Sequence, residues 1–297
     1  MLVSIILPLI LAFIMFSLGL GLKTRDFTQI LKFPKAFTMG LTNQLILLPV
    51  ITFALISIFG YSGELAVGIM ILAFSPGGVT TNVLTRIVHG NVPLSISMTG
   101  VTSLLSIFTV PLMVSMVVLH FMGSDAPDIN ITKLGLQMFF ITALPVLLGM
   151  LTTRLMPVLV EKISGIFNKL SISLFVIIVL AAIAKNWDVV WSNLPILGPM
   201  LALLNILLLT IGYISAKFAG LDRSDGFTIA IETGIQNGTL AIAVGTLITV
   251  NHATGVDLPP ITVPAAVYAV TMYVISMPIL WWLRRQLASK QPVAKLV

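Results

Sequence analysis

The chain has 297 residues, of which 58% are hydrophobic and only 9% are charged, and its net charge is +6. Soluble domains usually carry about 25% charged residues, so this composition excludes an ordinary soluble protein. The chain has no cysteine, which excludes disulfides, thiolate metal sites and a cysteine nucleophile. Continuous apolar runs of about 20 residues match the length of helices that cross a membrane, whereas a membrane β-barrel would show alternating polar positions. We therefore predict an all-α polytopic membrane protein.

Nine apolar segments predict nine transmembrane helices in a single domain, 1–297. In chain order they are 2–22, 34–59, 64–89, 92–121, 131–153, 157–184, 193–216, 224–250 and 261–283. We interpret the first segment as a span and not as a signal peptide, because no basic residue precedes it and its apolar part is too long.

The basic residues predict the orientation of these spans. All of the 16 lysines and arginines except Lys133 and Lys185 fall in loops on one side of the predicted membrane. Cytoplasmic loops collect basic residues, which places the N-terminus outside and the C-terminus inside. The same distribution argues against a nucleic-acid surface. The four tryptophans are interpreted as interface anchors: Trp187, Trp191, Trp281 and Trp282.

Two of the predicted spans contain helix-breaking residues. The third has "SPGG", with Pro76 and two glycines, and the eighth has "IETGIQNG", with Gly234 and Gly238. Each is the next-to-last span of its half of the chain, a pattern typical of transporters with inverted repeats. We predict repeats at 1–122, with four spans, and 131–287, with five. The alternative is that Pro76 only kinks its helix and the glycines only serve helix packing.

One carboxylate, Glu232, is predicted to lie well inside a span, whereas the other nine acids lie in loops or near span ends. An acid at this depth is a functional candidate because its burial is costly. It is either protonated or paired with a cation, and a bound metal cation is attractive because Arg223, the nearest basic residue, lies at the membrane edge. Polar residues in the second, third, fourth and eighth spans offer neutral oxygens: Asn43, Gln44, Thr80, Thr81, Asn82, Ser95, Thr99 and Gln236.

Other chemistry has little support in the sequence. His89, His120 and His252 lie near span ends, and the chain has neither a P-loop nor a nucleophile elbow. We therefore expect that the protein is not an enzyme and has no catalytic residues.

Four stretches resemble the bile acid:sodium symporter family. They are "GLGLKTRDF" with "KFPKA", "NQLILLP", "SPGGVTTNVLTRIVHGNVPLSISMT" and "IETGIQNGTLAIAV". Bacterial members commonly have ten spans in two inverted five-span repeats, and this chain resembles a nine-span form that lacks the first. The resemblance implies two discontinuous helices that cross, a core of spans two, three, four, seven, eight and nine, and a panel of spans one, five and six.

The resemblance also implies two transported sodium ions and a substrate site beside the crossing. The first Na⁺ site would use Thr81, Asn82, Ser95, Thr99 and Glu232. The second would use Gln44, Glu232, Gln236 and backbone carbonyls at Thr233 and Ile235. The substrate site would use Thr80, Asn237, the freed backbone around Val79, Thr271 and Tyr273. Relatives can have asparagine at the position of Tyr273, which bears on whether bile acids bind.

From these observations we expect a sodium-coupled symporter that takes up an organic anion, either bile acid-like or a small carboxylate, by alternating access. Two Na⁺ and the Glu232 carboxylate leave one positive charge, which suits an anion. The expected location is the bacterial inner membrane, with lipid as surroundings and no obligatory protein partner. The alternatives are a proton-coupled or uncoupled carrier or efflux protein on the same scaffold, a membrane enzyme that uses Glu232 as acid or base, and a sensor that binds without transport.

Overall fold

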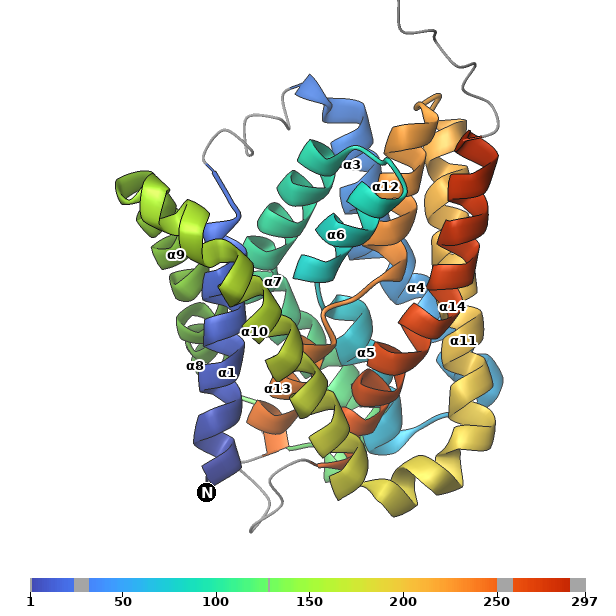
Figure 1. Cartoon of the computed structure of the whole chain (residues 1–297). Helices are drawn as coiled ribbons and strands as arrows, with labels where there is room; N and C mark the ends of the chain where they lie inside the picture. Colours follow the sequence, from blue (N-terminus) through green and yellow to red (C-terminus); the bar gives the residue numbers. More distant parts are fainter. Residues whose placement is uncertain (1, 24–31, 128, 250–258, 289–297) are drawn as a thin grey trace, which may run out of the picture.

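The computed structural model describes residues 2–23, 32–127, 129–249 and 259–288, and within these ranges the regular structure is helical. Figure 1 shows the arrangement of the helices. The elements are α1 (Leu2–Leu20), α3 (Pro34–Thr42), η1 (Asn43–Leu47), α4 (Leu48–Phe59), α5 (Gly63–Phe74), α6 (Val79–Ile87), α7 (Val92–Met122), η2 (Gly123–Asp125), α8 (Ile131–Met138), η3 (Phe139–Ala143), α9 (Leu144–Leu155), α10 (Pro157–Lys185), α11 (Trp187–Phe218), α12 (Arg223–Gly234), α13 (Gly238–Thr249), η4 (Pro260–Thr262) and α14 (Val263–Ala288).

Helices occupy each of the nine predicted segments. Six continuous helical stretches in the described residues are long and apolar enough to cross a membrane: Pro34–Phe59, Val92–Met122, Ile131–Leu155, Pro157–Lys185, Trp187–Phe218 and Pro260–Trp281. The first segment contributes a shorter apolar helix, Ile6–Leu20, and the third and eighth segments are each divided into two short helices. The seventh begins at Trp187 and not at 193, and it continues through Pro195 and Pro199.

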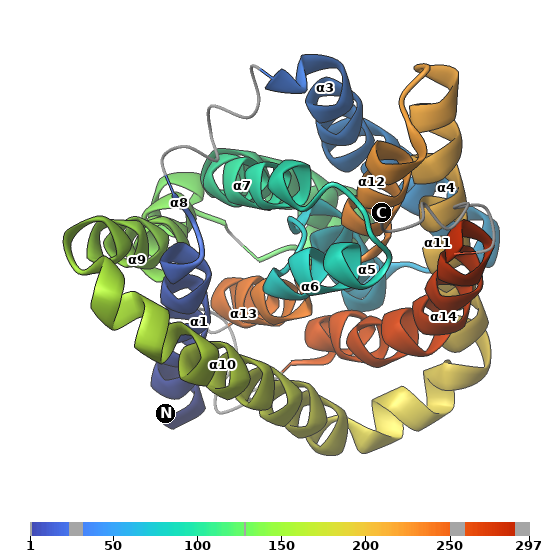
Figure 2. The same ribbon diagram turned by 45° about the horizontal axis from the view of Figure 1, so that its top comes forward.

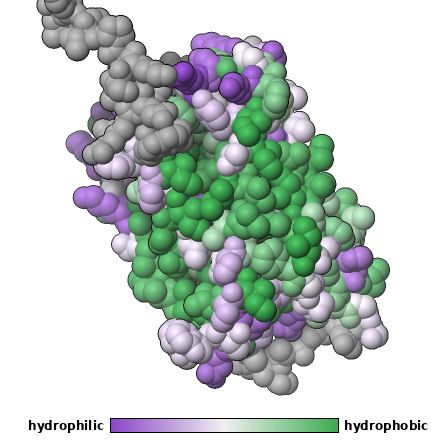
Figure 3. All heavy atoms as spheres, turned by 90° about the vertical axis from the view of Figure 1, so that its right-hand side faces the viewer, coloured by the Kyte–Doolittle hydropathy of each residue, from purple (hydrophilic) through white to green (hydrophobic). Residues whose placement is uncertain are grey.

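The surface carries a wide apolar belt. Figure 3 shows a hydrophobic band with hydrophilic residues gathered above and below it. Large apolar side chains on α4, α7, α11 and α14 face outward, among them Ile58, Phe108, Phe218 and Val274. Lipid tails are the solvent that such a belt requires, because a soluble monomer rarely exposes an apolar patch of this extent. The protein is an integral membrane protein.

The turns that carry most of the basic residues lie at one end of the molecule. In Figure 1 the starts of α3, α7, α10 and α12 and the end of α14 are at the top, whereas the start of α1 and the α10–α11 turn are at the bottom. This arrangement brings segments that are far apart in sequence to the same end, and the side of the membrane that this end faces stays a prediction.

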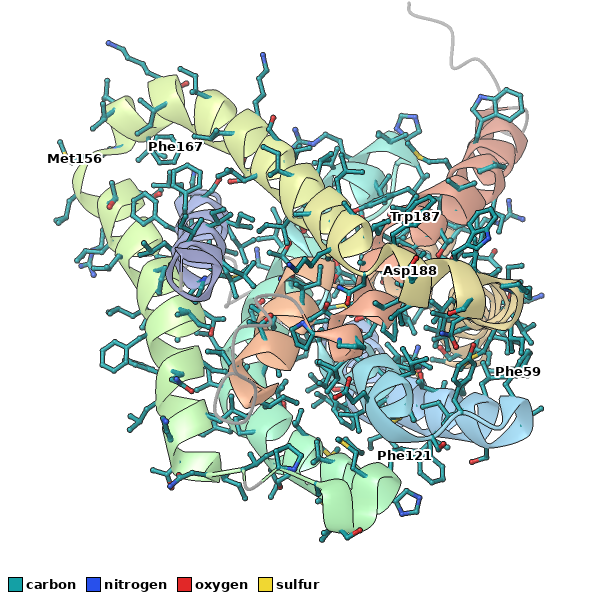
Figure 4. All side chains as sticks on the ribbon, turned by 90° about the horizontal axis from the view of Figure 1, so that it is seen from below. Phe59, Phe121, Met156, Phe167, Trp187 and Asp188 are labelled. Atoms are coloured by element: carbon teal, nitrogen blue, oxygen red, sulfur yellow. The ribbon has the colours of Figure 1, made fainter. Side chains whose placement is uncertain are left out.

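Helices α1, α8, α9 and α10 lie together on one side, and we call them the panel (Figure 2). Close backbone packing joins α1 to α9, since a Cβ added at Gly19 would lie 2.2 Å from the carbonyl oxygen of Val146 and one at Gly149 would lie 2.4 Å from that of Phe16. Phe13 of α1 stacks on Phe167 of α10 with ring centroids 5.2 Å apart. Figure 4 shows α10 running between the turns at Met156 and Trp187.

The remaining helices form what we call the core, with α5 and α12 at its centre. All ten residues from Asp225 to Gly234 in α12 are buried. Close contacts hold both helices, because a Cβ at Gly68 would lie 2.1 Å from the carbonyl oxygen of Ile261 and one at Gly212 would lie 2.8 Å from Cα of Ala230. Such close approach of helices at glycine is the usual way in which membrane helices pack.

Candidate functional site

The two interrupted helices meet at their interruptions. Gly77, between α5 and α6, and Gln236, between α12 and α13, form an antiparallel β-bridge. The amide of Asn237 also donates to the carbonyl oxygen of Pro76 at 2.8 Å. Each extended segment thus satisfies backbone groups that the other exposes, which is what allows a broken helix to remain buried in a membrane protein.

The sequence explains both interruptions. Ser75 and Ile235 follow α5 and α12 and have extended backbones, with ψ of 140° and 111°. Pro76 cannot donate to a helical carbonyl and favours an extended residue before it. The side chain of Asn237 restarts the second helix, because its Oδ1 accepts from the amide of Leu240 at 3.0 Å. This is the usual role of asparagine at a helix start.

Glu232 lies on α12 one turn before its interruption and is only 2% exposed. Thr99 Oγ1 lies 3.1 Å and 2.9 Å from its two carboxylate oxygens, and Ser95 Oγ donates to Oε1. Gly77 faces the same carboxylate, since a Cβ added there would lie 2.6 Å from Oε2. The acid therefore lies against the other broken helix and against α7, among neutral hydroxyl groups.

The other two members of the first predicted sodium site lie in this cluster. Thr81 Oγ1 donates to the carbonyl oxygen of Gly78 at 2.7 Å and lies 3.2 Å from Thr99 Oγ1. Asn82 Oδ1 lies 2.8 Å from Ser95 Oγ. The fold thus brings together Thr81, Asn82, Ser95, Thr99 and Glu232, which come from three separate helices. Together they present one carboxylate and four neutral polar side chains.

Most of the second predicted set lies at the same crossing. Gln44 Nε2 donates to Gln236 Oε1 at 2.8 Å and to the carbonyl oxygen of Ser75 at 2.7 Å. Gln236 Nε2 donates to the carbonyl oxygen of Thr233 at 2.7 Å. Gln44 lies in η1, a π-helical turn of the kind often found at functional sites. Ile235 is fully buried in the same interruption, and the hydrogen bonds described for Gln44 and Gln236 do not include Glu232.

A small pocket of about 40 Å³ lies between this crossing and the panel. Three of the predicted substrate residues line it, namely Thr80, Asn237 and Tyr273. Thr80 Oγ1 and the Tyr273 hydroxyl are 2.7 Å apart. Thr271 is not among the lining residues, and its hydroxyl donates to the carbonyl oxygen of Val267 in its own helix at 3.0 Å. Val79, predicted to contribute its backbone, is the first residue of α6, and its side chain lies outside the described residues.

The sequence analysis missed a buried polar cluster at the end of α12. Asn205 Nδ2 and the Tyr268 hydroxyl both donate to the carbonyl oxygen of Gly234 at 2.8 Å, and Ser276 Oγ donates to Asn205 Oδ1 at 3.0 Å. The three side chains are all fully buried. Asn205, within "ALLNILLL", could have indicated this cluster, because a polar residue in the middle of a membrane span usually bonds a partner on another helix.

The described residues contain no group of three or more His, Asp or Glu side chains that could hold a metal ion. A divalent-metal centre of that kind is therefore not found in the described part of the chain. The Glu232 cluster has a different chemistry, with a single acid and neutral oxygens.

Comparison with known proteins connects this geometry to a family. The family model described as "Sodium Bile acid symporter family" matches residues 8–193. A Bacillus subtilis protein described as "Uncharacterized sodium-dependent transporter YocS" is 26% identical over 90% of this chain and 79% of its own length. The human ileal sodium/bile acid cotransporter is 28% identical over 80% of this chain and 68% of its own.

A rice chloroplast protein, "Probable sodium/metabolite cotransporter BASS2", is 29% identical over 88% of this chain and 60% of its own length. The chain thus spans less than two thirds of that relative. All three relatives are named as transporters or cotransporters and none as an enzyme, which supports the expectation that this protein is not one. Since the family model covers more than half of its residues, the chain belongs to the sodium bile acid symporter family.

Proposed function

We propose that this protein is a secondary transporter that takes up an organic anion together with sodium. The observation that carries the proposal is the position of Glu232, a buried carboxylate in a shell of hydroxyl oxygens where two broken helices cross. The relatives named as sodium-dependent transporters or cotransporters support the same conclusion.

The first Na⁺ binds at Glu232 with Thr81, Asn82, Ser95 and Thr99 as neutral ligands. A hard cation suits this set because every member offers oxygen and only the acid carries charge. The ion offsets the cost of burying the carboxylate, which has hydroxyl partners in the described structure.

The second Na⁺ binds between Gln44 and Gln236, with Glu232 and the carbonyls of Thr233 and Ile235. Two half-helices, α5 and α12, end here, and the C-terminal ends of broken helices favour cations. Rotation of the Gln44 and Gln236 amides, which now bond each other, would present their oxygens to the ion.

The anion binds in the pocket between the crossing and the panel. Helices α6 and α13 both begin at its wall, since Gly78, Thr80, Gly238 and Thr239 line it. Helix N-termini carry partial positive charge and free amide donors, which suit a carboxylate. Of the predicted substrate residues, we retain Thr80, Asn237 and Tyr273 in this role, with the backbone at Val79, whereas Thr271 is not among the residues that line the pocket.

Transport proceeds by alternating access, with the core moving against the panel around the pocket. The chain crosses the bacterial inner membrane nine times, in repeats 1–122 and 131–287, so its termini lie on opposite sides. The N-terminus is outside and the C-terminus is in the cytoplasm, because cytoplasmic loops collect basic residues. Two Na⁺ with a monoanion move one net positive charge inward, worth about 2.3 kcal/mol at 100 mV. Substrate screening in a sodium gradient would identify the anion.

Thermal unfolding of the purified protein in Na⁺, K⁺ or choline tests the proposal for wild type, Glu232→Ala and Glu161→Ala. Glu161 is an exposed acid on α10 and serves as the matched control. Sodium at about one hundred times its Kd stabilises the folded state by about 2.7 kcal/mol. We expect this gain in wild type and in Glu161→Ala, and its loss in Glu232→Ala.

Proton coupling is the second candidate, because the described partners of Glu232 are neutral hydroxyl groups and a proton would also neutralise it. In that case Na⁺ and choline would give the same melting curve. Wild type, but not Glu232→Ala, would instead gain stability as the pH falls.

A further inference from the structure

The pocket is bounded by both bodies of the protein. Its core wall holds Thr80, Asn237 and Tyr273, and its panel wall is formed by Ile14 of α1 and by Ser171, Ile172 and Phe175 of α10. The panel wall is thus mainly apolar. The Phe175 ring stands edge-on to the Tyr273 ring, with centroids 6.5 Å apart, so aromatic side chains join the two walls.

Ser171 is the exception in this wall. Its side chain is 3% exposed, and its hydroxyl oxygen has no hydrogen-bond partner in the described part of the chain. A buried polar group left unpaired costs about 1–3 kcal/mol. Two other hydroxyls among the described residues share this condition, Tyr61 and Ser103, but neither lines the pocket.

A serine inside a helix usually satisfies itself by donating to the carbonyl four residues earlier. Ser173, two residues further along α10, does so, because its Oγ donates to the carbonyl oxygen of Lys169 at 3.0 Å. Ser171 lacks such a bond within the described structure. Its hydroxyl therefore keeps both its donor and its acceptor capacity at the wall of a pocket.

The polar groups of the core wall are already partly occupied. Thr80 and Tyr273 bond each other at 2.7 Å, and Asn237 Oδ1 accepts from the amide of Leu240 at 3.0 Å. Ser171 lines the same pocket from the opposite body. A ligand whose carboxylate lies at the starts of α6 and α13 would leave its other end next to α10.

We propose that Ser171 is the panel's contact to the substrate, and that it hydrogen-bonds a second polar group of the anion, such as a hydroxyl or a keto oxygen. The inference rests on the proposed function and adds a specificity-determining residue to it. Because the carboxylate is held by the core and the second group by the panel, the substrate bridges the two bodies that move against each other.

Ser171→Ala and Ser173→Ala test this role in proteoliposomes with a sodium gradient. The probes are pyruvate and pantoate, which are small carboxylates with a keto or hydroxyl group, and taurocholate as a bulky anion. For a transported probe we expect Ser171→Ala to raise KM about tenfold, the loss of a hydrogen bond of about 1.4 kcal/mol. Ser173→Ala should leave KM unchanged.

Stability separates this role from a structural one. Removing an unpaired buried hydroxyl should leave the melting temperature of the substrate-free protein unchanged or slightly raised, and the stabilisation by Na⁺ should remain. A structural serine would instead lower the melting temperature. If Ser171→Ala lowers it and leaves KM unchanged, the inference is overturned.

Thiol labelling gives a readout that does not depend on transport. The chain has no cysteine, so Ser171→Cys and Ser173→Cys each introduce a single thiol. With Na⁺ present, a bound probe should slow the reaction of N-ethylmaleimide with the thiol at position 171 and leave the thiol at position 173 unaffected. If no probe protects position 171 while Na⁺ still stabilises the protein, the inference fails and the proposed function stands. If Na⁺ does not stabilise wild type, the proposed function itself fails.

Discussion

The two interrupted helices share a construction and differ in chemistry. In each, a backbone carbonyl at the end of the first half-helix accepts a hydrogen bond from a side-chain amide of an earlier span. Gln44 Nε2 donates to Ser75 in the first interruption at 2.7 Å, and Asn205 Nδ2 donates to Gly234 in the second at 2.8 Å. Helix ends expose such carbonyls, and lipid cannot satisfy them.

The difference lies in the further partners of the two amides. Gln44 also bonds Gln236, so the first interruption is tied to the second. Asn205 bonds Tyr268 and Ser276 and holds the second interruption against α14. The predicted ligands of the first sodium ion are also divided between the two broken helices. Glu232 belongs to the second, whereas Thr81 and Asn82 belong to the first. Neither helix alone contains a complete predicted ion site, which makes ion binding sensitive to how the two cross.

The largest expected effect comes from Gly77→Ala. The new Cβ would lie 2.6 Å from Glu232 Oε2 and would displace the carboxylate from Ser95 and Thr99. We expect the stabilisation by Na⁺, about 2.7 kcal/mol at one hundred times Kd, to disappear in thermal unfolding.

Gly78→Ala is the matched control for that change. A Cβ at Gly78 meets Thr80 Oγ1 at 3.6 Å, an ordinary contact. If both variants lost the response to Na⁺, the effect would come from stiffening of the interruption and not from the carboxylate.

Gln44→Ala and Asn205→Ala compare the two amides directly. Each leaves a buried carbonyl without its amide donor, so each should lower the free energy of unfolding by about 1–3 kcal/mol. Only Gln44→Ala should also weaken the response to Na⁺, because the hydrogen bonds described for Asn205 do not reach a predicted sodium ligand. Melting in Na⁺ and in choline measures both quantities, and equal sodium responses in the two variants would contradict the distinction.

Asn237→Asp tests the start of the second half-helix. Aspartate still accepts from the amide of Leu240, so stability should change by less than about 0.5 kcal/mol. A negative charge at the wall of the pocket should raise KM for an anion about tenfold, or about 1.4 kcal/mol. Uptake of the same probes at saturating Na⁺ measures it, and an unchanged KM would place the carboxylate of the substrate elsewhere.

The smallest effect concerns the link between the first interruption and α14. Thr80→Ala, Tyr273→Phe and the double variant form a cycle around the 2.7 Å hydrogen bond between the two hydroxyls. We expect a coupling energy of about 1 kcal/mol in thermal or chemical unfolding. Additive losses in the double variant would show that the bond contributes nothing to stability.

Several parts of the site could be predicted from the sequence. Pro76, Gly77 and Gly78 marked one interruption and Gly234 and Gly238 marked the other, because proline and glycine break or loosen a helix. Glu232 stood out because an acid inside a membrane span is costly to bury. Neutral polar residues near these points supplied the predicted ligand sets, with the family resemblance as a guide. The first set is brought together as predicted, although its binding of sodium stays a prediction.

Other parts had weak signals or none. Asn205 and Ser276 are single polar residues in apolar spans, and such residues are as often packing groups as functional ones. Ser171 resembles Ser173 in sequence, and only the pocket and the missing partner in the described structure distinguish them. Thr271 was placed at the substrate site by the family resemblance, but its hydroxyl bonds the preceding turn of its own helix.

The sequence by itself determined the helical class, the membrane setting and the interruptions. These follow from composition and local pattern, since the lipid and the backbone act on each segment separately. Only the tertiary structure decided that Gly77 pairs with Gln236, that Glu232 lies against α7, and that Ser171 lines a pocket. Those contacts join residues that lie far apart in the chain, and their geometry depends on how whole helices pack.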